Sequence, residues 1–153
     1  ANTIVGAVPG AMPALIGSAA AIGSIDSRVW MVFALLFLWQ LPHFFAIAWM
    51  YREDYAKGGY RMLSVIDGSG GKTAVHSIIS CMAMIAVSFA PTLIGHAGVY
   101  YSIAAAVLGL AMLVCTLRMA MRLSRESARL VLLASVLYLP AMLLALLLDR
   151  VVG

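Results

Sequence analysis

Five long apolar stretches constrain this chain more than any other feature. A helix needs about 20 apolar residues to cross a hydrocarbon core of about 30 Å at about 1.5 Å per residue. Five segments are long enough to do so: residues 2–22, 29–51, 74–96, 99–121 and 128–149. Their apolar runs are continuous rather than alternating, which favours helices over strands. With 64% hydrophobic and 10% charged residues, residues 1–153 are predicted to form one all-α, polytopic transmembrane helical bundle in a lipid bilayer.

The connections between these segments differ in length and charge. Three are short, as expected between antiparallel neighbours, whereas residues 52–73 form a long, charged loop that contains glycine. Most of the ten Lys and Arg residues fall on one side of the predicted membrane: Arg52, Lys57, Arg61, Lys72, Arg118, Arg122, Arg125 and Arg129. Only Arg28 and Arg150 fall on the other. The positive-inside rule therefore places loop 52–73 and the N-terminus on the cytoplasmic or matrix side, and the C-terminus opposite.

Several functional classes are disfavoured by the sequence. The net charge of +4 is explained by membrane topology, and no basic and aromatic pattern typical of a nucleic-acid module accompanies it. Cys81 and Cys115 lie inside apolar spans without a CxxC spacing, as inert core cysteines do. No phosphate-binding glycine loop ahead of a strand, HExxH motif or nucleophile elbow is present. The candidate chemistry therefore lies at the cytoplasmic ends of the helices.

The second span contains polar side chains at a depth where they are costly. Gln40 and His43 are one turn apart on nearly one face, and His43 lies about 12 Å below the loop. Pro42 frees a backbone carbonyl, which needs a partner or a cavity. Two interpretations stay open for these residues: a hydrogen bond to another helix, or a site that faces a ligand.

The long loop combines carboxylates and cations. Its ionisable residues next to the second span are Arg52, Glu53, Asp54, Lys57 and Arg61. A diphosphate bound through Mg²⁺ needs carboxylate oxygens for the metal and cations for the phosphoryl oxygens, and this loop offers both. The alternative is an ordinary solvated loop, with Tyr55 as an interfacial anchor.

Two motifs carry a resemblance to a known family. They are Trp39-Gln40-x-Pro42-His43-Phe44, and Arg52-Glu53-Asp54-Tyr55-x-x-Gly58-Gly59-Tyr60-x-Met62-Leu63-Ser64-Val65. This pattern resembles the protohaem IX farnesyltransferases (haem o synthases) among the UbiA-type intramembrane prenyltransferases. Residues 2–13 are similar to the family's fifth helix, and residues 125–130 with Leu139-Pro140 to its last hairpin. The resemblance thus covers nearly the whole chain.

The resemblance implies a fold and an activity. The family forms a nine-helix bundle whose cavity opens to the cytoplasm, and the five spans here are similar to helices five to nine. Its members transfer farnesyl from farnesyl diphosphate to a vinyl group of haem b and release diphosphate, making haem o for terminal oxidases. Mg²⁺ held by two acidic motifs assists the departure of diphosphate. The implied location is a bacterial or mitochondrial inner membrane, and the implied partners are haem a synthase or terminal oxidase assembly factors.

The resemblance also implies roles for individual residues. Asp54 matches the second acidic motif and is expected to bind Mg²⁺, with Glu53 as a catalytic neighbour. The implied substrate-binding residues are Arg52, Lys57 and Arg61 for diphosphate, His43 with Gln40 for haem, and Trp39 and Tyr55, with Phe44 and Phe45 lining a pocket. The superfamily often has a second Asp four residues after the first, where this chain has Gly58.

A larger departure concerns the superfamily's first acidic motif, Asn-Asp-x-x-Asp-x-x-x-Asp. It has no counterpart here, because the only aspartates are Asp26, Asp54, Asp67 and Asp149. We therefore expect the C-terminal part of a longer enzyme, a truncated gene product or one part of a split enzyme, inactive without an N-terminal half. The principal rival is a non-catalytic haem-handling or assembly subunit, and a quinone-pathway prenyltransferase is a weaker one.

Overall fold

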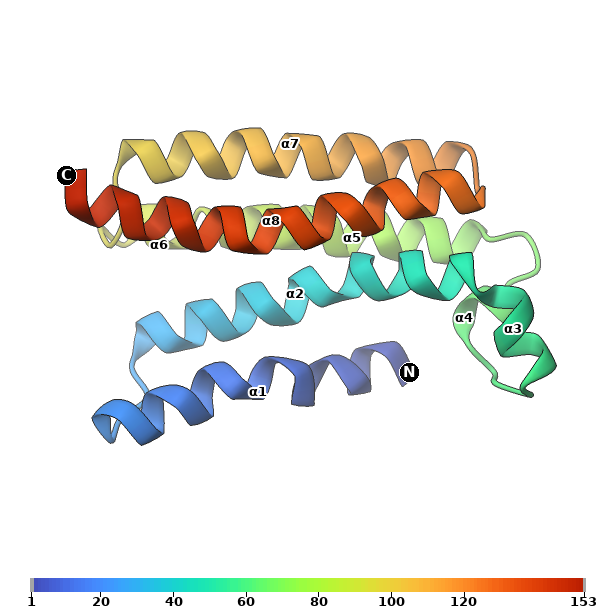
Figure 1. The fold of residues 1–153 in the computed structure, drawn as a ribbon, viewed down its shortest axis with the longest axis horizontal. Helices are drawn as coiled ribbons and strands as arrows, with labels where there is room; N and C mark the ends of the chain where they lie inside the picture. Colours follow the sequence, from blue (N-terminus) through green and yellow to red (C-terminus); the bar gives the residue numbers. More distant parts are fainter. Residues whose placement is uncertain (1, 153) are drawn as a thin grey trace.

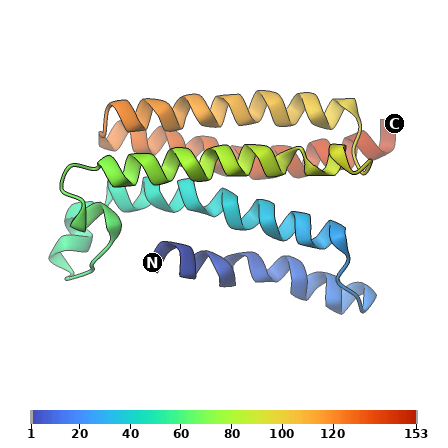
Figure 2. The ribbon, with the colours of Figure 1, turned by 180° about the vertical axis from the view of Figure 1, so that it is seen from behind.

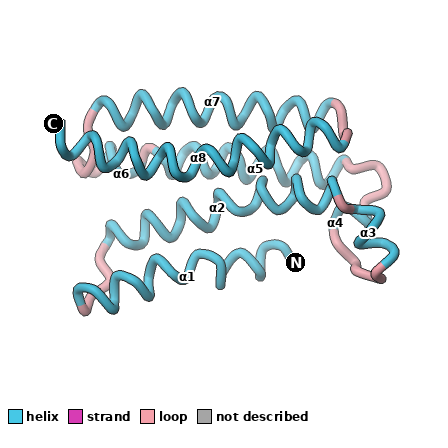
Figure 3. Tube along the Cα trace, in the orientation of Figure 1, coloured by secondary structure: helices cyan, strands magenta, loops and turns pink. Residues whose placement is uncertain are grey.

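The computed structural model describes residues 2–152, which form helices joined by short connections (Figures 1 and 3). The helices are α1 (Asn2–Ile22), α2 (Ser27–Met50), α3 (Arg52–Lys57), α4 (Leu63–Ile66), α5 (Gly71–Ser88), α6 (Ala90–Leu93), α7 (Val99–Met121) and α8 (Arg125–Val152). Five segments are long and apolar enough to span a membrane, and no strand occurs among the described residues. The predicted all-α transmembrane bundle is confirmed, and the chain is an integral membrane protein.

Helix α2 is central to the packing of the bundle. It contacts α1, α5 and α8, while α7 packs against both α5 and α8. Helix α1 lies at the outer edge beside α2 in both views (Figures 1 and 2). Side chains on different faces of α2 therefore meet different helices.

The charged connections gather at one end of the bundle. Helices α3 and α4, the N-terminal end of α5 and the α7–α8 connection lie at that end (Figure 1). The α1–α2 turn, α6 and the C-terminus lie at the other. We call the first the α3–α4 end, and it brings together segments that are far apart in the sequence.

The core is built from small side chains, methionines and tyrosines. Its largest fully buried residues are Tyr101, Tyr138, Met84, Met112, Met119 and Met142. Large aliphatic side chains such as Leu110 and Leu137 instead point outward, with 62% and 70% of their surface exposed. This is the arrangement expected in lipid, where apolar side chains lose nothing by exposure and small residues let helices approach closely.

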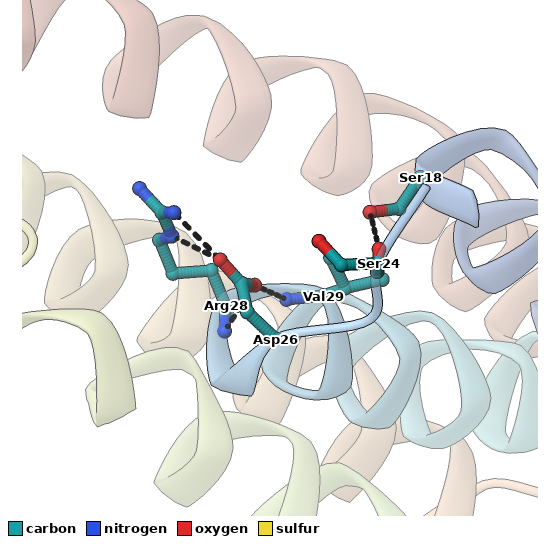
Figure 4. A network of polar contacts seen from close by, with 5 residues as sticks. All are labelled: Ser18, Ser24, Asp26, Arg28 and Val29. Atoms are coloured by element: carbon teal, nitrogen blue, oxygen red, sulfur yellow. Dashed lines mark hydrogen bonds and ion pairs between the residues drawn. The ribbon is translucent and has the colours of Figure 1, made fainter. Parts of the chain in front are cut away.

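Helix α2 begins at Ser27, two residues before the predicted position, because Asp26 caps it. The Asp26 carboxylate accepts the N–H groups of Arg28 and Val29 at 3.0 and 3.1 Å (Figure 4). It also forms an ion pair with Arg28 at 2.6 Å, and the Ser18 hydroxyl ties the turn by donating to the Ser24 carbonyl. The hydrogen bond from the Arg28 side chain, followed by that from the Val29 N–H, holds the pKa of Asp26 below its usual value.

The predicted third span, 74–96, is interrupted. Helix α5 ends at Ser88 and is followed by the short α6, because Pro91 has no N–H to continue the ladder. The Ser88 carbonyl at the break accepts the Tyr101 hydroxyl at 2.9 Å, and the Ser88 hydroxyl contacts that of Tyr138 at 2.5 Å. The break is thus satisfied by α7 and α8, as a buried backbone group in a membrane requires.

Helix α8 begins at Arg125, three residues earlier than predicted. The Ser124 hydroxyl accepts the Ser127 N–H at 3.1 Å, and the Ser127 hydroxyl accepts the Ser124 N–H at 3.2 Å, which starts the helix. At the opposite end, the largely buried Asp149 accepts the N–H groups of Gly98 and Tyr101 and so caps α7. Helices α7 and α8 are therefore tied at both ends.

The segment predicted as a long loop, 52–73, contains the two short helices α3 and α4. Glu53 and Asp54 lie in the first turn of α3 and Lys57 in its last turn. This order of charges complements the helix dipole and favours a helical turn where sequence spacing alone predicts a loop.

Candidate functional site

The polar residues of α2 are held by hydrogen bonds to neighbouring helices. Trp39 donates its indole Nε1–H to the Ser135 carbonyl on α8 at 2.7 Å. His43, one turn further, contacts the Ser135 hydroxyl through Nδ1 at 2.8 Å. The two rings stack, with centroids 5.2 Å apart and planes inclined by 26°. Trp39 and His43 thus form one unit anchored on a single residue of α8.

The Ser135 hydroxyl determines the tautomer of His43. A hydroxyl carries one proton, and that of Ser135 is donated to the Leu132 carbonyl at 2.7 Å. The contact with His43 is therefore made by Nδ1–H donating to the Ser135 oxygen. In the neutral imidazole, Nε2 then carries the free lone pair, which is the atom that binds metals or accepts protons.

Gln40 has different partners from His43, although sequence spacing places both on nearly one face. Its amide donates to the Leu36 carbonyl at 3.0 Å and to the Ala7 carbonyl on α1 at 3.4 Å. A Cβ at Gly10 would collide with this side chain, so Gly10 is what lets α1 approach. No hydrogen bond joins Gln40 to His43 among the described residues, because Gln40 packs toward α1 and His43 toward α8. The expectation that Gln40 supports His43 therefore stays a prediction without a contact behind it.

Three charged residues of α3, Arg52, Glu53 and Asp54, line a polar pocket of about 330 Å³ at the α3–α4 end. We call it the α3 pocket; its lining residues are Trp49, Met50, Arg52, Glu53, Asp54, Leu123, Ser124 and Arg125. The Arg52 guanidinium carbon lies 4.4 Å above the Trp49 ring, a cation–π contact that holds it against the pocket. Of the predicted site residues, the structure thus brings Arg52, Glu53 and Asp54 together.

Gly70 packs against two residues that line the α3 pocket. Its φ of +74° is in the left-handed region, and a Cβ there would collide with Trp49 and Leu123, which both line the pocket. Asp67 fixes this turn by accepting the Thr73 N–H and the Ser69 hydroxyl, both at 3.1 Å. Burial raises the pKa of the Asp67 carboxyl, but these hydrogen bonds and that from the Lys72 N–H outweigh it, so its pKa lies below the usual 3.8.

A second pocket, of about 300 Å³ and mostly apolar, lies between α1 and α2. We call it the α1–α2 pocket; its lining residues are Thr3, Gly6, Phe44, Ile47, Tyr55 and Met62. Tyr55 belongs to α3, so this short helix contributes to both pockets, polar residues to one and an aromatic ring to the other. A ligand with a charged head and an apolar chain matches this pair of environments.

Other predicted residues lie elsewhere. Lys57 and Arg61 are exposed and line neither pocket. Phe45, expected to line a pocket, is 4% exposed and packs in a core cluster with Ala7 and Leu41. In the described residues no group of three or more His, Cys, Asp or Glu is placed to hold a metal ion.

Sequence reasoning missed five residues of the α3 pocket. Trp49 and Met50 directly precede the predicted residues in the sequence, whereas Leu123, Ser124 and Arg125 come from the α7–α8 connection and the start of α8. Their only signal was that Arg125 fell on the same side of the membrane as Arg52 in the count of charges. A shared side does not predict a shared pocket.

Comparisons with known proteins agree on one group. The model of the UbiA prenyltransferase family matches residues 1–139. The protoheme IX farnesyltransferase of Solibacter usitatus is 49% identical over 149 residues, 97% of this chain and 51% of that protein. The protoheme IX farnesyltransferase of Salinibacter ruber is 43% identical over 97% of this chain and 52% of that protein. The mitochondrial protoheme IX farnesyltransferase of Arabidopsis thaliana is 39% identical over 98% of this chain and 35% of that protein. No solved structure matches significantly. The chain spans about half the length of the bacterial relatives named here.

Proposed function

The chain belongs to the UbiA prenyltransferase family, and we propose that it supplies the C-terminal half of a protohaem IX farnesyltransferase. The reaction joins farnesyl, from farnesyl diphosphate, to a vinyl group of haem b and releases diphosphate. The names of its relatives support this assignment. The observation that carries it is the α3 pocket, where Arg52, Glu53 and Asp54 converge at the end of a transmembrane helix.

In this proposal the α3 pocket receives the diphosphate group. The Arg52 guanidinium is held beside the pocket by Trp49 and supplies a cation for the phosphoryl oxygens. As the bond between farnesyl and diphosphate breaks, negative charge accumulates on the diphosphate, and a fixed cation stabilises it. The electron-rich vinyl carbon of haem b captures the allylic cation, which leaves a positive charge on the neighbouring carbon of the former vinyl group. Water then adds to that carbon and loses a proton, so the product carries a hydroxyalkyl group.

A magnesium ion fits the donors that this chain offers. Mg²⁺ is typically held by one or two carboxylates together with water and substrate phosphates, and Glu53 and Asp54 line the pocket with two. When bound, the ion would offset the negative charge of the leaving diphosphate. We propose Asp54 as the principal ligand and Glu53 as its neighbour, with further carboxylates coming from outside this chain.

The remaining residues suit the two apolar substrates. Phe44 and Tyr55 of the α1–α2 pocket are proposed to contact the isoprenoid chain next to the diphosphate. His43 is proposed to contact haem, because the Ser135 hydrogen bond leaves its Nε2 lone pair available for iron. Trp39 holds the His43 ring by stacking, and Gln40 positions α1 rather than haem.

The orientation in the membrane is part of the proposal. Segment 52–73 and the α7–α8 connection lie at the α3–α4 end (Figure 1), and most of the basic residues of the chain fall in or next to these two segments. By the positive-inside rule this end faces the cytoplasm or the mitochondrial matrix. Farnesyl diphosphate would then enter the α3 pocket from that compartment.

A chimeric enzyme tests the function. These 153 residues would replace the aligned region of the Solibacter usitatus relative, and the chimera would be expressed in membranes that lack any haem o synthase. Formation of haem o from haem b and farnesyl diphosphate is expected, and the chain alone is expected to form none. A folded chimera that binds haem but transfers no farnesyl would refute the proposal and favour a haem-handling subunit. Prenylation of an aromatic quinone precursor instead would favour a quinone-pathway enzyme.

A further inference from the structure

Arg125 lines a part of the α3 pocket that α3 does not form. Arg52, Glu53 and Asp54 come from α3, whereas Ser124 directly precedes α8 and Arg125 is its first residue. The two groups belong to segments about 70 residues apart in the sequence that meet only at the α3–α4 end of the bundle (Figure 1). A ligand in this pocket would therefore be enclosed by both.

The Arg125 side chain is positioned by an aromatic ring, as that of Arg52 is. Its guanidinium carbon lies 5.7 Å above the ring of Tyr51, while that of Arg52 lies 4.4 Å above Trp49. Both rings belong to the C-terminal end of α2. Within the part of the chain that the structure describes, neither guanidinium forms an ion pair, although Glu53 and Asp54 line the same pocket. The pocket thus contains two oriented cations that no carboxylate neutralises directly.

The backbone around Arg125 adds to this positive field. Arg125 is the first residue of α8, so its N–H and that of Glu126 have no acceptor within the helix. The caps formed by Ser124 and Ser127 use the N–H groups of those two serines and leave the N–H groups of Arg125 and Glu126 without an acceptor among the described hydrogen bonds. A helix N-terminus attracts negative charge. Side chain and backbone at this point therefore favour the same type of ligand, an anion.

We propose that Arg125 binds the diphosphate group of the isoprenoid substrate together with Arg52, which lines the same pocket. This inference rests on the proposed function and adds a binding residue to it. Lys57 and Arg61, the cations favoured by the sequence motif, do not line the pocket, so Arg125 supplies its second positive charge. A diphosphate bound by both residues would accept hydrogen bonds from two planar guanidinium groups, each of which can donate two parallel N–H groups to phosphoryl oxygens.

The test compares variants of the chimera in detergent. Arg125→Gln removes the charge while keeping a polar side chain of similar reach, and Arg125→Lys keeps the charge but not the planar donor. Arg129→Gln is the matched control, because Arg129 is one turn further along α8, exposed, and outside the pocket lining. Binding of inorganic diphosphate in the presence of Mg²⁺ is measured by calorimetry, the KM values for farnesyl diphosphate and haem b by turnover, and folding by thermal unfolding.

For Arg125→Gln we expect diphosphate affinity to fall, and KM for farnesyl diphosphate to rise, by about 10- to 100-fold, the range for losing one charged hydrogen-bond partner. The KM for haem b and the melting temperature should stay unchanged. Arg125→Lys should lose less diphosphate affinity than Arg125→Gln, and Arg129→Gln should lose less than about twofold.

Wild-type diphosphate affinity in Arg125→Gln would overturn the inference. An equal loss in Arg129→Gln would also overturn it, since the effect would then reflect net charge. If Arg125→Gln does not fold, the folded Arg125→Lys variant decides, because a merely structural contact with Tyr51 would leave its diphosphate affinity unchanged. A chimera that binds diphosphate through Arg125 yet makes no haem o would refute the proposed reaction and leave this site standing.

Discussion

Replacement of Gly70 by alanine should destabilise the α3–α4 end by an amount that the structure divides into two contributions. The first is conformational, because Gly70 has a φ of +74° and an L-residue in that region costs roughly 1–2 kcal/mol. The second is steric, because the new methyl group would meet the Trp49 ring and the Leu123 side chain. Inserting a methyl group into a packed site costs about 1–3 kcal/mol. The expected loss in the free energy of unfolding is therefore about 2–5 kcal/mol.

Gly59→Ala is the matched control for the conformational contribution. Gly59 has nearly the same φ, +73°, but a Cβ there would have no neighbour within 4 Å. Its replacement should cost only roughly 1–2 kcal/mol. Adding Leu123→Ala to Gly70→Ala should recover part of the steric loss and not all of it, because the Trp49 ring stays in place.

The assay is denaturant unfolding of the purified chain in detergent micelles, followed by circular dichroism. In the chimera, Gly70→Ala should also weaken diphosphate binding more than Gly59→Ala does, since Trp49 positions Arg52. Equal free energies of unfolding for Gly70→Ala and Gly59→Ala would show that the close approach of Gly70 to Trp49 and Leu123 does not affect stability. Our account of how Gly70 packs against the α3 pocket would then be wrong.

Three further predictions concern single ionisable groups. Asp54→Asn in the chimera should lower turnover at least about tenfold, from the loss of a charged contact, and shift the Mg²⁺ titration to higher concentration; wild-type turnover with an unshifted profile would remove Asp54 from the site. His43→Ala should weaken haem binding or change its absorption spectrum while farnesyl diphosphate affinity persists, and Ser135→Ala should change the spectrum less, because it frees the tautomer and keeps the imidazole; an unchanged spectrum in His43→Ala would favour a purely structural histidine. The pKa of Asp67 is lowered on folding from its usual 3.8. Its contribution to stability is therefore complete above that value and disappears as pH falls through the folded pKa. Melting temperatures of Asp67→Asn should depend less on pH below about 4 than those of the wild type, and parallel curves would contradict this.

The sequence alone determined the membrane character and the number of spans. Continuous apolar runs of about 20 residues have few alternatives to a transmembrane helix, and the fourth span, 99–121, matches α7 at both ends. Boundaries were less certain where a cap or a proline decides them. Asp26 extended α2 and Ser124 extended α8 through capping hydrogen bonds, whereas Pro91 divided the third span because it lacks an N–H. Apolar periodicity reports neither effect.

Some residues of the candidate site were predictable from the sequence, and others were placed only by the tertiary structure. The sequence indicated Arg52, Glu53 and Asp54 because they are consecutive, and consecutive residues at the end of a span stay close in any fold. Only the tertiary structure placed Arg125 in the same pocket, because this proximity depends on how α2 and α8 pack. It also separated Gln40 from His43. Residues three apart on a helix point about 60° apart, and with α1 beside one face of α2 and α8 beside the other, that angle assigns Gln40 to α1 and His43 to α8. Helical spacing fixes the angle between two side chains, whereas the packing of the neighbouring helices decides what each side chain meets.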